Sequence, residues 1–224
     1  MVGHDSIQRR GSAAVIALAA LALLAAPLAA RAGAQVEENL APSVVSVLSR
    51  QISDHPVPAS YGAKPELRAW LDQMSLRLAS RFPDPRERED LLATVHYEAT
   101  RAALDPQLVL AVIQYESAFR KYAISSAGAR GYMQVMPFWT KLVGAKPNDL
   151  FHLRINLRYG CVILRHYLDI ENGDIYRALG RYNGSLGQPE YPNGVIATQN
   201  RNWNYGPAIP GTKPGVVTAS ALAQ

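Results

Sequence analysis

Residues 105–119 read DPQLVLAVIQYESAF, and this stretch decides the fold of the chain. Asp105 followed by Pro106 is the pairing of an N-cap residue with a first-turn proline that opens many helices. Residues 108–113 are all apolar, so this part of the helix has no polar face to turn toward water. The sequence therefore predicts a buried central helix that runs to Phe119 and carries one carboxylate, Glu116, near its end.

Upstream of this stretch, apolar residues also recur at helical spacing. Large apolar side chains lie mostly three or four positions apart between Pro65 and Leu78, which predicts an amphipathic helix. The prolines at positions 83 and 85 end that pattern. A second helix is predicted from Pro85 to Ala103.

Downstream of the central helix, a turn-rich loop precedes further helical stretches. Serine and glycine residues between Ser125 and Gly131 supply the turns. No segment alternates in the way that is typical of a strand, so the predicted fold class is all-α, mostly helical. The further helices are expected over residues 133–142, from the Asn148-Asp149 cap to Asn172-Gly173, and from the Asp174 cap to Tyr182.

Length and composition indicate a globular protein with one domain of ordinary size. The chain has 224 residues, of which 48% are hydrophobic and 18% charged. Its formal net charge of +5 becomes +3 without residues 1–34, because that segment holds three arginines and one aspartate. Such modest basicity suits an anionic polymer such as a cell wall and does not point to nucleic acid. Cys161 is the only cysteine, so no internal disulfide can form.

The first 34 residues have the layout of a secretory signal peptide. Arg9 and Arg10 precede an Ala- and Leu-rich run, and small residues up to Ala34 offer cleavage sites. A membrane anchor is the alternative, because the run is nearly long enough to cross a bilayer, but its alanine content and Pro27 favour cleavage. We expect the mature protein in the periplasm, with membrane contact only through this segment before cleavage.

Two other segments have the composition of appendages. Residues 35–64 contain several prolines and predict a linker or pro-segment with little core of its own. Residues 206–224 predict a disordered tail. The folded domain is therefore expected over residues 65–205.

Glu116 is the residue whose surroundings point most directly to chemistry. It follows a run of mostly apolar residues, and it lies near the negative end of the helix dipole. Both effects favour the protonated carboxyl and raise its pKa, so Glu116 is suited to donate a proton near neutral pH. The alternative is an ordinary glutamate that caps the helix or forms a salt bridge on an exposed face.

Several short motifs follow one another along the chain from position 105. They are Asp105-Pro106, Glu116-Ser117-x-Phe119, Ala123-x-Ser125, Ala127-Gly128-Ala129-x-Gly131-x-Met133-Gln134-x-Met136-Pro137, Asn156 with Gly160, and Tyr182-Asn183-Gly184. In this order and spacing they resemble the soluble lytic transglycosylase catalytic domain, which has a helical, lysozyme-like fold. The resemblance covers about residues 104–203, and Tyr191, Val195 and Trp203 resemble the family's last helix. The sequence departs from the family at Tyr132, where leucine is usual, and at Gly184-Ser185, where Ala-Gly is usual.

The resemblance also implies roles for individual residues. Glu116 takes the place of the family's catalytic acid and base, and residues 128–134 take the place of the segment that lines the sugar groove. Three of the implied residues have a structural alternative, because Ser117 can bond the preceding turn, Gln134 can lie on the surface, and Tyr182 can belong to the core. The residues expected to bind substrate are Ser117, Gly131, Tyr132, Met133, Gln134, Tyr182 and Asn183.

The implied reaction is cleavage of the β-1,4 bond between MurNAc and GlcNAc in peptidoglycan glycan strands, with formation of 1,6-anhydro-MurNAc. Glu116 acts first as general acid and then as base, and no second carboxylate is expected beside it, because Asp105 and Asp149 are read as helix caps. The alternatives are a lysozyme-type hydrolase, a non-catalytic wall-binding protein, and a wall-opening accessory of a secretion or conjugation system. In the last case residues 35–64 or the tail would dock to an envelope partner.

The sequence predicts no cofactor and no metal site. The histidines at positions 55, 96, 152 and 166 are scattered and lack the spacing of metal ligands. The chain has neither a glycine-rich phosphate loop nor a nucleic-acid-binding motif.

Overall fold

The computed structural model describes residues 35–52, 55–62 and 64–206, and this part of the chain is helical. It contains no strand, only two isolated antiparallel bridges, which join Arg130 to Ile124 and to Val135. The all-α prediction is therefore confirmed. The predicted signal peptide and all but the first residue of the predicted tail lie outside the described residues.

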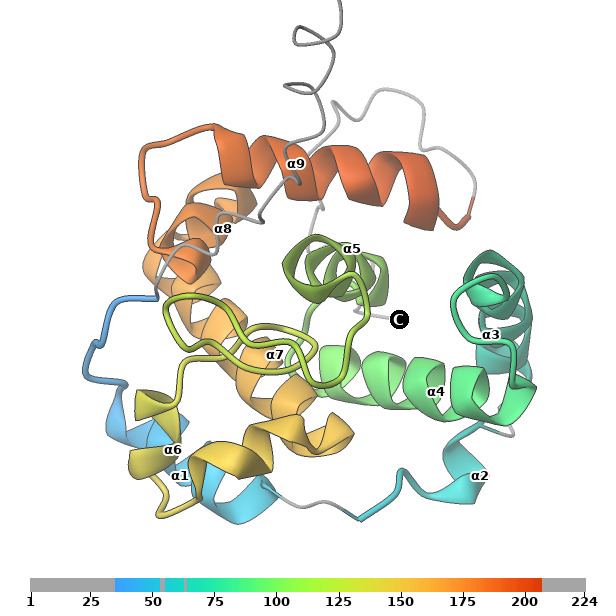
Figure 1. The fold of residues 1–224 in the computed structure, drawn as a ribbon, viewed down its shortest axis with the longest axis horizontal. Helices are drawn as coiled ribbons and strands as arrows, with labels where there is room; N and C mark the ends of the chain where they lie inside the picture. Colours follow the sequence, from blue (N-terminus) through green and yellow to red (C-terminus); the bar gives the residue numbers. More distant parts are fainter. Residues whose placement is uncertain (1–34, 53–54, 63, 207–224) are drawn as a thin grey trace, which may run out of the picture. The chain divides into compact units, whose positions relative to one another are not determined.

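Helix α5, Pro106–Ser117, lies at the centre of the domain, between α4 and α9 (Figure 1). The Asp105 carboxylate caps it by accepting a hydrogen bond from the backbone N–H of Gln107 at 2.8 Å. Residues 108–113 are at most 5% exposed, as expected for a helix covered on all sides. The helix ends two residues before Phe119, because Ala118 and Phe119 adopt positive φ angles of 50° and 63°.

The remaining long helices enclose α5 and agree with the predicted breaks. Helices α3 and α4 flank the proline-rich break, and α7 ends before Asn172, whose φ is 52°. Two elements follow the last predicted helix, and both pack on α5. The bounds are α3 Pro65–Leu78, α4 Pro85–Arg101, α7 Leu153–Ile170, α8 Ile175–Asn183, α9 Glu190–Thr198, the 3-10 helix η1 Pro147–Phe151 and the π-helical turn η2 Gln199–Trp203.

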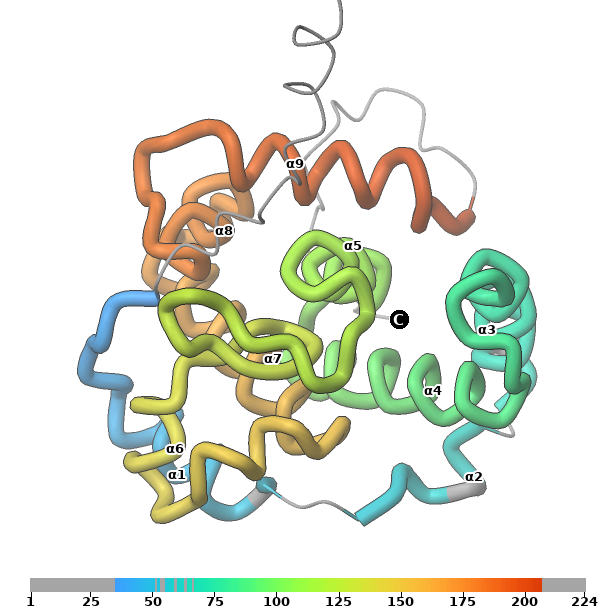
Figure 2. The backbone as a smooth tube through the Cα atoms, in the orientation of Figure 1, coloured from blue at the N-terminus to red at the C-terminus, as the bar shows by residue number. Residues whose placement is uncertain are grey.

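The helix predicted over residues 133–142 is wrong in its first half. Only α6, Phe138–Lys141, is helical there. Arg130 pairs with Val135 through both backbone hydrogen bonds, and Gln134 adopts φ +50°, so residues 130–135 form a tight turn. The apolar residues at helical spacing here do not form one face of a helix, because Met133 packs against Gly160 of α7 from the turn. Figure 2 shows the yellow-green loop of residues 118–137 beside the end of α5.

The segment before α3 packs on the domain instead of standing apart from it. It contains α1, Pro42–Gln51, and the short α2, Ala59–Gly62, neither of which the sequence analysis predicts. Leu40 and Leu48 are buried in the domain core, and the side-chain oxygen of Gln35 accepts a hydrogen bond from Trp139 Nε1 at 2.9 Å. The sequence analysis expects this segment to have little core of its own, and it does not predict that Leu40 and Leu48 become part of the domain core.

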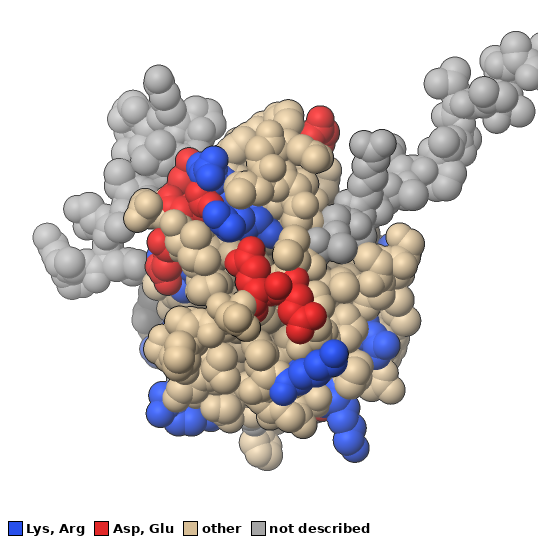
Figure 3. Space-filling model, turned by 90° about the vertical axis from the view of Figure 1, so that its left-hand side faces the viewer, with Lys and Arg blue, Asp and Glu red and all other residues tan. Residues whose placement is uncertain are grey.

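Buried and surface ion pairs fix the position of α7 and α8. Glu98 of α4 is fully buried, and its carboxylate lies 3.0 Å from Arg154 Nε and 3.2 Å from Arg158 Nη1 on α7. On α8, Arg177 and Arg181 both pair with Glu171. Figure 3 looks onto the side that carries α1, α6 and α8 and shows acidic and basic side chains next to one another there. This face therefore presents no broad field of one sign.

Candidate active site

Glu116 lies in the last turn of α5, where its side chain is only partly exposed. Burial of the carboxyl group raises its pKa from 4.5 to about 7. A hydrogen bond from the Tyr191 hydroxyl to Glu116 Oε1, at 2.6 Å, acts in the opposite direction because it stabilises the carboxylate. Near neutral pH, Glu116 is therefore poised between a proton donor and a proton acceptor.

Tyr191 reaches Glu116 from helix α9, 75 positions further along the chain. Its ring is buried and packs edge-on against Tyr115, with ring centroids 5.2 Å apart. Gly194, one turn later on α9, lets Tyr115 approach closely, since a Cβ atom there would lie 2.6 Å from the Tyr115 hydroxyl oxygen. The sequence analysis notes Tyr191 only as part of a helix and misses this contact, because nothing local in the sequence brings the two positions together.

A single amide, Asn156 of α7, holds the turn next to Glu116. Its Oδ1 accepts a hydrogen bond from the Met133 N–H at 2.8 Å, and its Nδ2 donates to Arg130 O at 2.9 Å and Leu150 O at 2.8 Å. Gly131 allows this clamp, because it adopts φ +75° and a Cβ atom there would overlap the Asn156 amide. The motif pieces at 131 and 156 are thus two parts of one contact.

The two loop residues expected to face the sugar are almost completely buried. Met133 is 0% exposed and fills the space over Gly160, where a Cβ atom would overlap its side chain. Gln134 is 5% exposed, and its Nε2 donates to Gly131 O at 2.9 Å and to Ala123 O at 3.2 Å. The Gln134 amide nitrogen therefore braces the loop. Tyr132 is 7% exposed, and burial raises the pKa of its phenol to about 12.

Ser117 joins the loop to helix α5. It is 1% exposed, and its hydroxyl lies 2.8 Å from Tyr132 O and 3.1 Å from Ile113 O. This geometry matches the structural alternative, a bond to the preceding turn, and it leaves the hydroxyl engaged on two backbone carbonyls. The sugar contact of Ser117 stays a prediction.

Tyr182 also acts on the loop. It is fully buried on α8, and its hydroxyl donates to Met133 O at 2.8 Å. Burial raises the pKa of its phenol well above the usual value, and the nearby charge of Glu116 adds to that increase. Asn183, the next residue, is 5% exposed. The structure thus brings Tyr182 near Glu116 but gives the direct hydrogen bond to Tyr191, and the substrate contacts of Tyr182 and Asn183 stay predictions.

The other carboxylates named from the sequence are structural. Asp105 caps the opposite end of α5 and also accepts a hydrogen bond from Gln199 Nε2 at 2.8 Å. Asp149 accepts one from the backbone N–H of Lys146 at 2.8 Å and so caps η1, whereas His152 is the N-cap residue of α7. Within the described part of the chain, no three acidic, histidine or cysteine side chains cluster as metal ligands would. No helix among the same residues is long and apolar enough to span a bilayer.

Part of the chain matches a described protein family and curated relatives. Residues 94–194 match the family described as the Transglycosylase SLT domain, from within α4 to within α9. The transglycosylase of Enterobacteria phage PRD1 is 32% identical over 124 residues, which cover 52% of this chain and 46% of that protein. The membrane-bound lytic murein transglycosylase C of Mannheimia succiniciproducens is 38% identical over 64 residues, which cover 29% and 18%. The chain thus spans less than half of the length of these relatives.

One solved structure is similar to the fold. It is an inactive mutant of the lytic transglycosylase Slt from Pseudomonas aeruginosa, with a TM-score of 0.41 and 21% identity over 75% of this chain and 35% of that chain. The family match contains Glu116, Asn156, Tyr182 and Tyr191, the residues from which the site is built. Residues 94–194 therefore resemble a transglycosylase SLT domain, and this match covers slightly less than half of the chain.

Proposed function

We propose that this protein cleaves the glycan strands of peptidoglycan as a lytic transglycosylase, with Glu116 as its single acid and base. The observation that carries the proposal is the environment of Glu116, a carboxyl group with a pKa of about 7 and one charge-stabilising partner, Tyr191. A group with this pKa exchanges a proton readily in both directions at neutral pH. The SLT domain supports peptidoglycan as the substrate.

The reaction requires two proton transfers on the same carboxyl group. Glu116 first gives its proton to the oxygen of the β-1,4 bond between MurNAc and GlcNAc, and the bond from that oxygen to the anomeric carbon breaks. The resulting carboxylate then takes the proton of the MurNAc 6-hydroxyl, whose oxygen bonds to the anomeric carbon. The products are a 1,6-anhydro-MurNAc end and a free GlcNAc 4-hydroxyl, and Glu116 is again protonated. The N-acetyl group of the substrate steadies the positive charge that develops between the two steps.

The surroundings of Glu116 favour one carboxylate over two. Paired glycosidase carboxyl groups lie about 5–9.5 Å apart, close enough to perturb each other's pKa. No carboxylate of the described residues contributes to the raised pKa of Glu116, which comes from burial alone. Asp105 is bound at the other end of a 12-residue helix, about 16 Å away at 1.5 Å per residue.

The proposal includes export to the periplasm through residues 1–34. It rests on the two arginines, the apolar run and the small residues that precede position 35. Cell fractionation followed by mass spectrometry of the N-terminus tests it. A periplasmic form that begins near Gln35 supports export, and an uncleaved cytoplasmic chain rejects it.

The deciding experiment for the activity is mass spectrometry of the muropeptides released from purified sacculi. We expect anhydro-MurNAc products from the wild-type protein and none from Glu116→Gln. Glu37→Gln is the matched control, because this exposed side chain lies far from α5 in sequence and loses the same charge. Products with reducing ends would instead establish lysozyme-type hydrolysis, and no release by the wild-type protein would reject both readings.

A further inference from the structure

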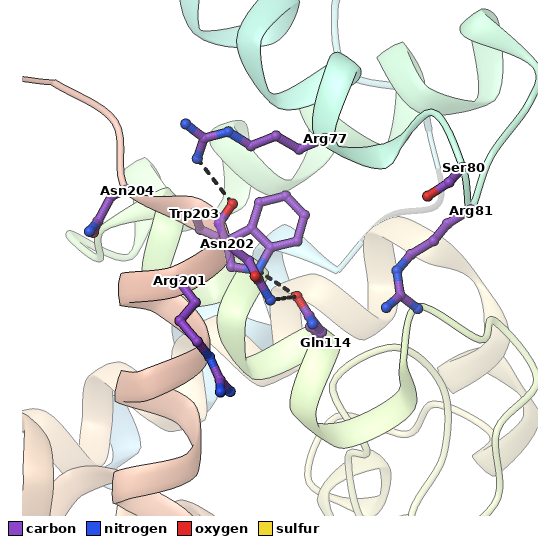
Figure 4. A pocket seen from close by; sticks show the side chains of 8 residues that line it. All are labelled: Arg77, Ser80, Arg81, Gln114, Arg201, Asn202, Trp203 and Asn204. Carbon is purple, nitrogen blue, oxygen red and sulfur yellow. Dashed lines mark hydrogen bonds between the residues drawn. The ribbon is translucent and has the colours of Figure 1, made fainter.

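All three tryptophans of the chain donate their indole N–H to the side-chain oxygen of a glutamine. Trp70 of α3 donates to Gln107 at 3.1 Å, and Trp203 of η2 donates to Gln114 at 2.9 Å. Figure 4 shows the second of these pairs. Because both glutamines lie on α5, the two bonds tie α3 and η2 to that helix.

The third pair joins α6 to the segment before α1. Gln35 Oε1 accepts hydrogen bonds from Trp139 Nε1 at 2.9 Å and from the backbone N–H of Met136 at 3.2 Å. Gln35 is 5% exposed and Trp139 is 0% exposed, so water cannot readily replace this acceptor. Gln35 also lies outside the matched family segment at 94–194. The contact is therefore one that this chain adds to that segment.

The Gln35 side chain holds the turn of residues 130–136, which is joined to α5 beside Glu116. Gln35 bonds this turn at Met136, just before α6 begins. Other side chains bond it at residues 132 and 133, and they are Ser117, Asn156 and Tyr182. Gln35 thus holds the end of the turn, while the other three hold its middle.

Gln35 also lies beside Tyr182 of α8. Burial raises the pKa of the Tyr182 phenol well above its usual value, the charge of Glu116 raises it further, and a hydrogen bond with the Gln35 side chain acts in the opposite direction. Three residues later, the Glu38 carboxylate lies 3.7 Å from Arg181 of α8. Figure 1 shows the start of the described chain next to α8. Tyr182 is therefore within electrostatic reach of both Glu116 and Gln35.

We infer that Gln35 is a positioning residue for the proposed reaction, which acts through the turn of residues 130–136 rather than on the substrate. The inference rests on the proposed function, since it takes Glu116 as the group that transfers protons. Without the Gln35 oxygen, the N–H groups of Met136 and Trp139 lose their acceptor, and the turn opens more often. Proton transfer then starts less often from the correct geometry, so kcat falls while KM changes little.

The first test needs no substrate and follows the full protein by NMR. Gln35→Met keeps a side chain of similar length without the amide oxygen. Gln107→Met is the matched control, because it removes the same kind of bond, from Trp70, at the end of α5 far from Glu116. Gln35→Glu keeps an acceptor oxygen and is the conservative variant. Thermal melting checks that each variant is folded at the temperature of the measurement.

We expect Gln35→Met to shift the indole N–H signal of Trp139 and to speed amide hydrogen exchange of residues 130–136 about tenfold, as for loss of one buried hydrogen bond. Gln107→Met should shift the Trp70 signal and leave that exchange unchanged, and Gln35→Glu should bring it back toward the wild-type rate. Unchanged exchange of residues 130–136 in Gln35→Met, or exchange equally fast in Gln107→Met, would overturn the inference.

The second test is the steady-state rate of muropeptide release from sacculi. We expect kcat to fall about tenfold in Gln35→Met with little change in KM, to stay at the wild-type value in Gln107→Met, and to recover in Gln35→Glu. A wild-type kcat in Gln35→Met would overturn the inference and leave the proposed function standing. A wild-type protein that releases no muropeptides would reject the proposed function, and the exchange rates would still decide whether Gln35 holds the turn.

Discussion

Replacing Glu116 with glutamine should stabilise the protein at alkaline pH. The folded-state pKa of Glu116 is about 7, against 4.5 for a free side chain. Below pH 4.5 the carboxyl is protonated in both states, so its ionisation has no effect on folding. Between pH 4.5 and 7 the unfolded chain releases the proton while the folded protein keeps it, so the free energy of unfolding falls as pH rises. Above pH 7 the loss is complete.

The size of the effect follows from the two pKa values. A difference of about 2.5 pKa units, at 1.36 kcal/mol each, makes the wild-type protein about 3 kcal/mol less stable above pH 7 than below pH 4.5. Glutamine has nearly the same shape, carries no charge at any pH, and can still accept the hydrogen bond from Tyr191. Glu116→Gln should therefore be about 3 kcal/mol more stable than wild type at pH 8 and nearly equal to it at pH 4.5.

Thermal unfolding followed by circular dichroism between pH 4.5 and 8 measures this difference. For a domain of this size, about 3 kcal/mol corresponds to an increase in Tm of roughly 6–12 °C at pH 8. Glu37→Gln, a change at an exposed position, serves as control and should leave the difference from wild type below about 0.5 kcal/mol throughout. A Tm difference between Glu116→Gln and wild type that stays constant across this pH range would refute the electrostatic account of the site.

Three further substitutions probe the same structure. Tyr191→Phe removes the hydrogen bond that lowers the pKa of Glu116, so the alkaline limb of the pH–activity profile should move up by about one pH unit. The same variant should lose about tenfold in kcat, and steady-state rates measured against pH check both results. Asn156→Ala leaves Met133 N, Arg130 O and Leu150 O without a buried partner and should cost about 3–5 kcal/mol in urea unfolding. Gly131 adopts φ +75°, and a Cβ atom there would overlap the Asn156 amide, so Gly131→Ala should lower the free energy of unfolding by at least about 2 kcal/mol in the same assay. A variant as stable as the wild type would contradict the contact between Gly131 and Asn156.

The helices could be predicted wherever a cap and an apolar period agree. Asp105 before α5 and Asp174 before α8 both accept hydrogen bonds from the helix N-terminus, as their sequence positions indicate. The prediction failed at residues 133–142, where helical spacing is real but Gln134 adopts φ +50°. The backbone conformation of this turn is set by a tertiary contact with Asn156, which local sequence preferences cannot predict. Helix α1 was missed for the same reason, since its partner is α7.

The candidate site could be predicted only in part. The pKa argument for Glu116 needed a buried helix end, which the sequence supplies, and the structure gives the expected direction. The sequence analysis counts Tyr182 among the substrate contacts and Tyr191 only as part of the last helix, whereas Tyr191 makes the bond to Glu116 and Tyr182 bonds Met133 O. Tyr191 lies on α9, which packs on α5, whereas Tyr182 lies on α8, which packs on α7 and α9, and periodicity along the sequence does not report these pairings.

Three of the seven residues expected to touch substrate make the same kind of contact. Ser117, Gln134 and Tyr182 each bind a backbone carbonyl of residues 131–133, and all three are at most 5% exposed. Their polar groups therefore form hydrogen bonds that hold the loop in place. Preorganised backbone of this kind keeps the position of Glu116 fixed while its proton moves. Substitutions at these positions should then act on the geometry of the loop, whereas the proposed proton transfers belong to Glu116, with the Tyr191 hydroxyl as its hydrogen-bond partner.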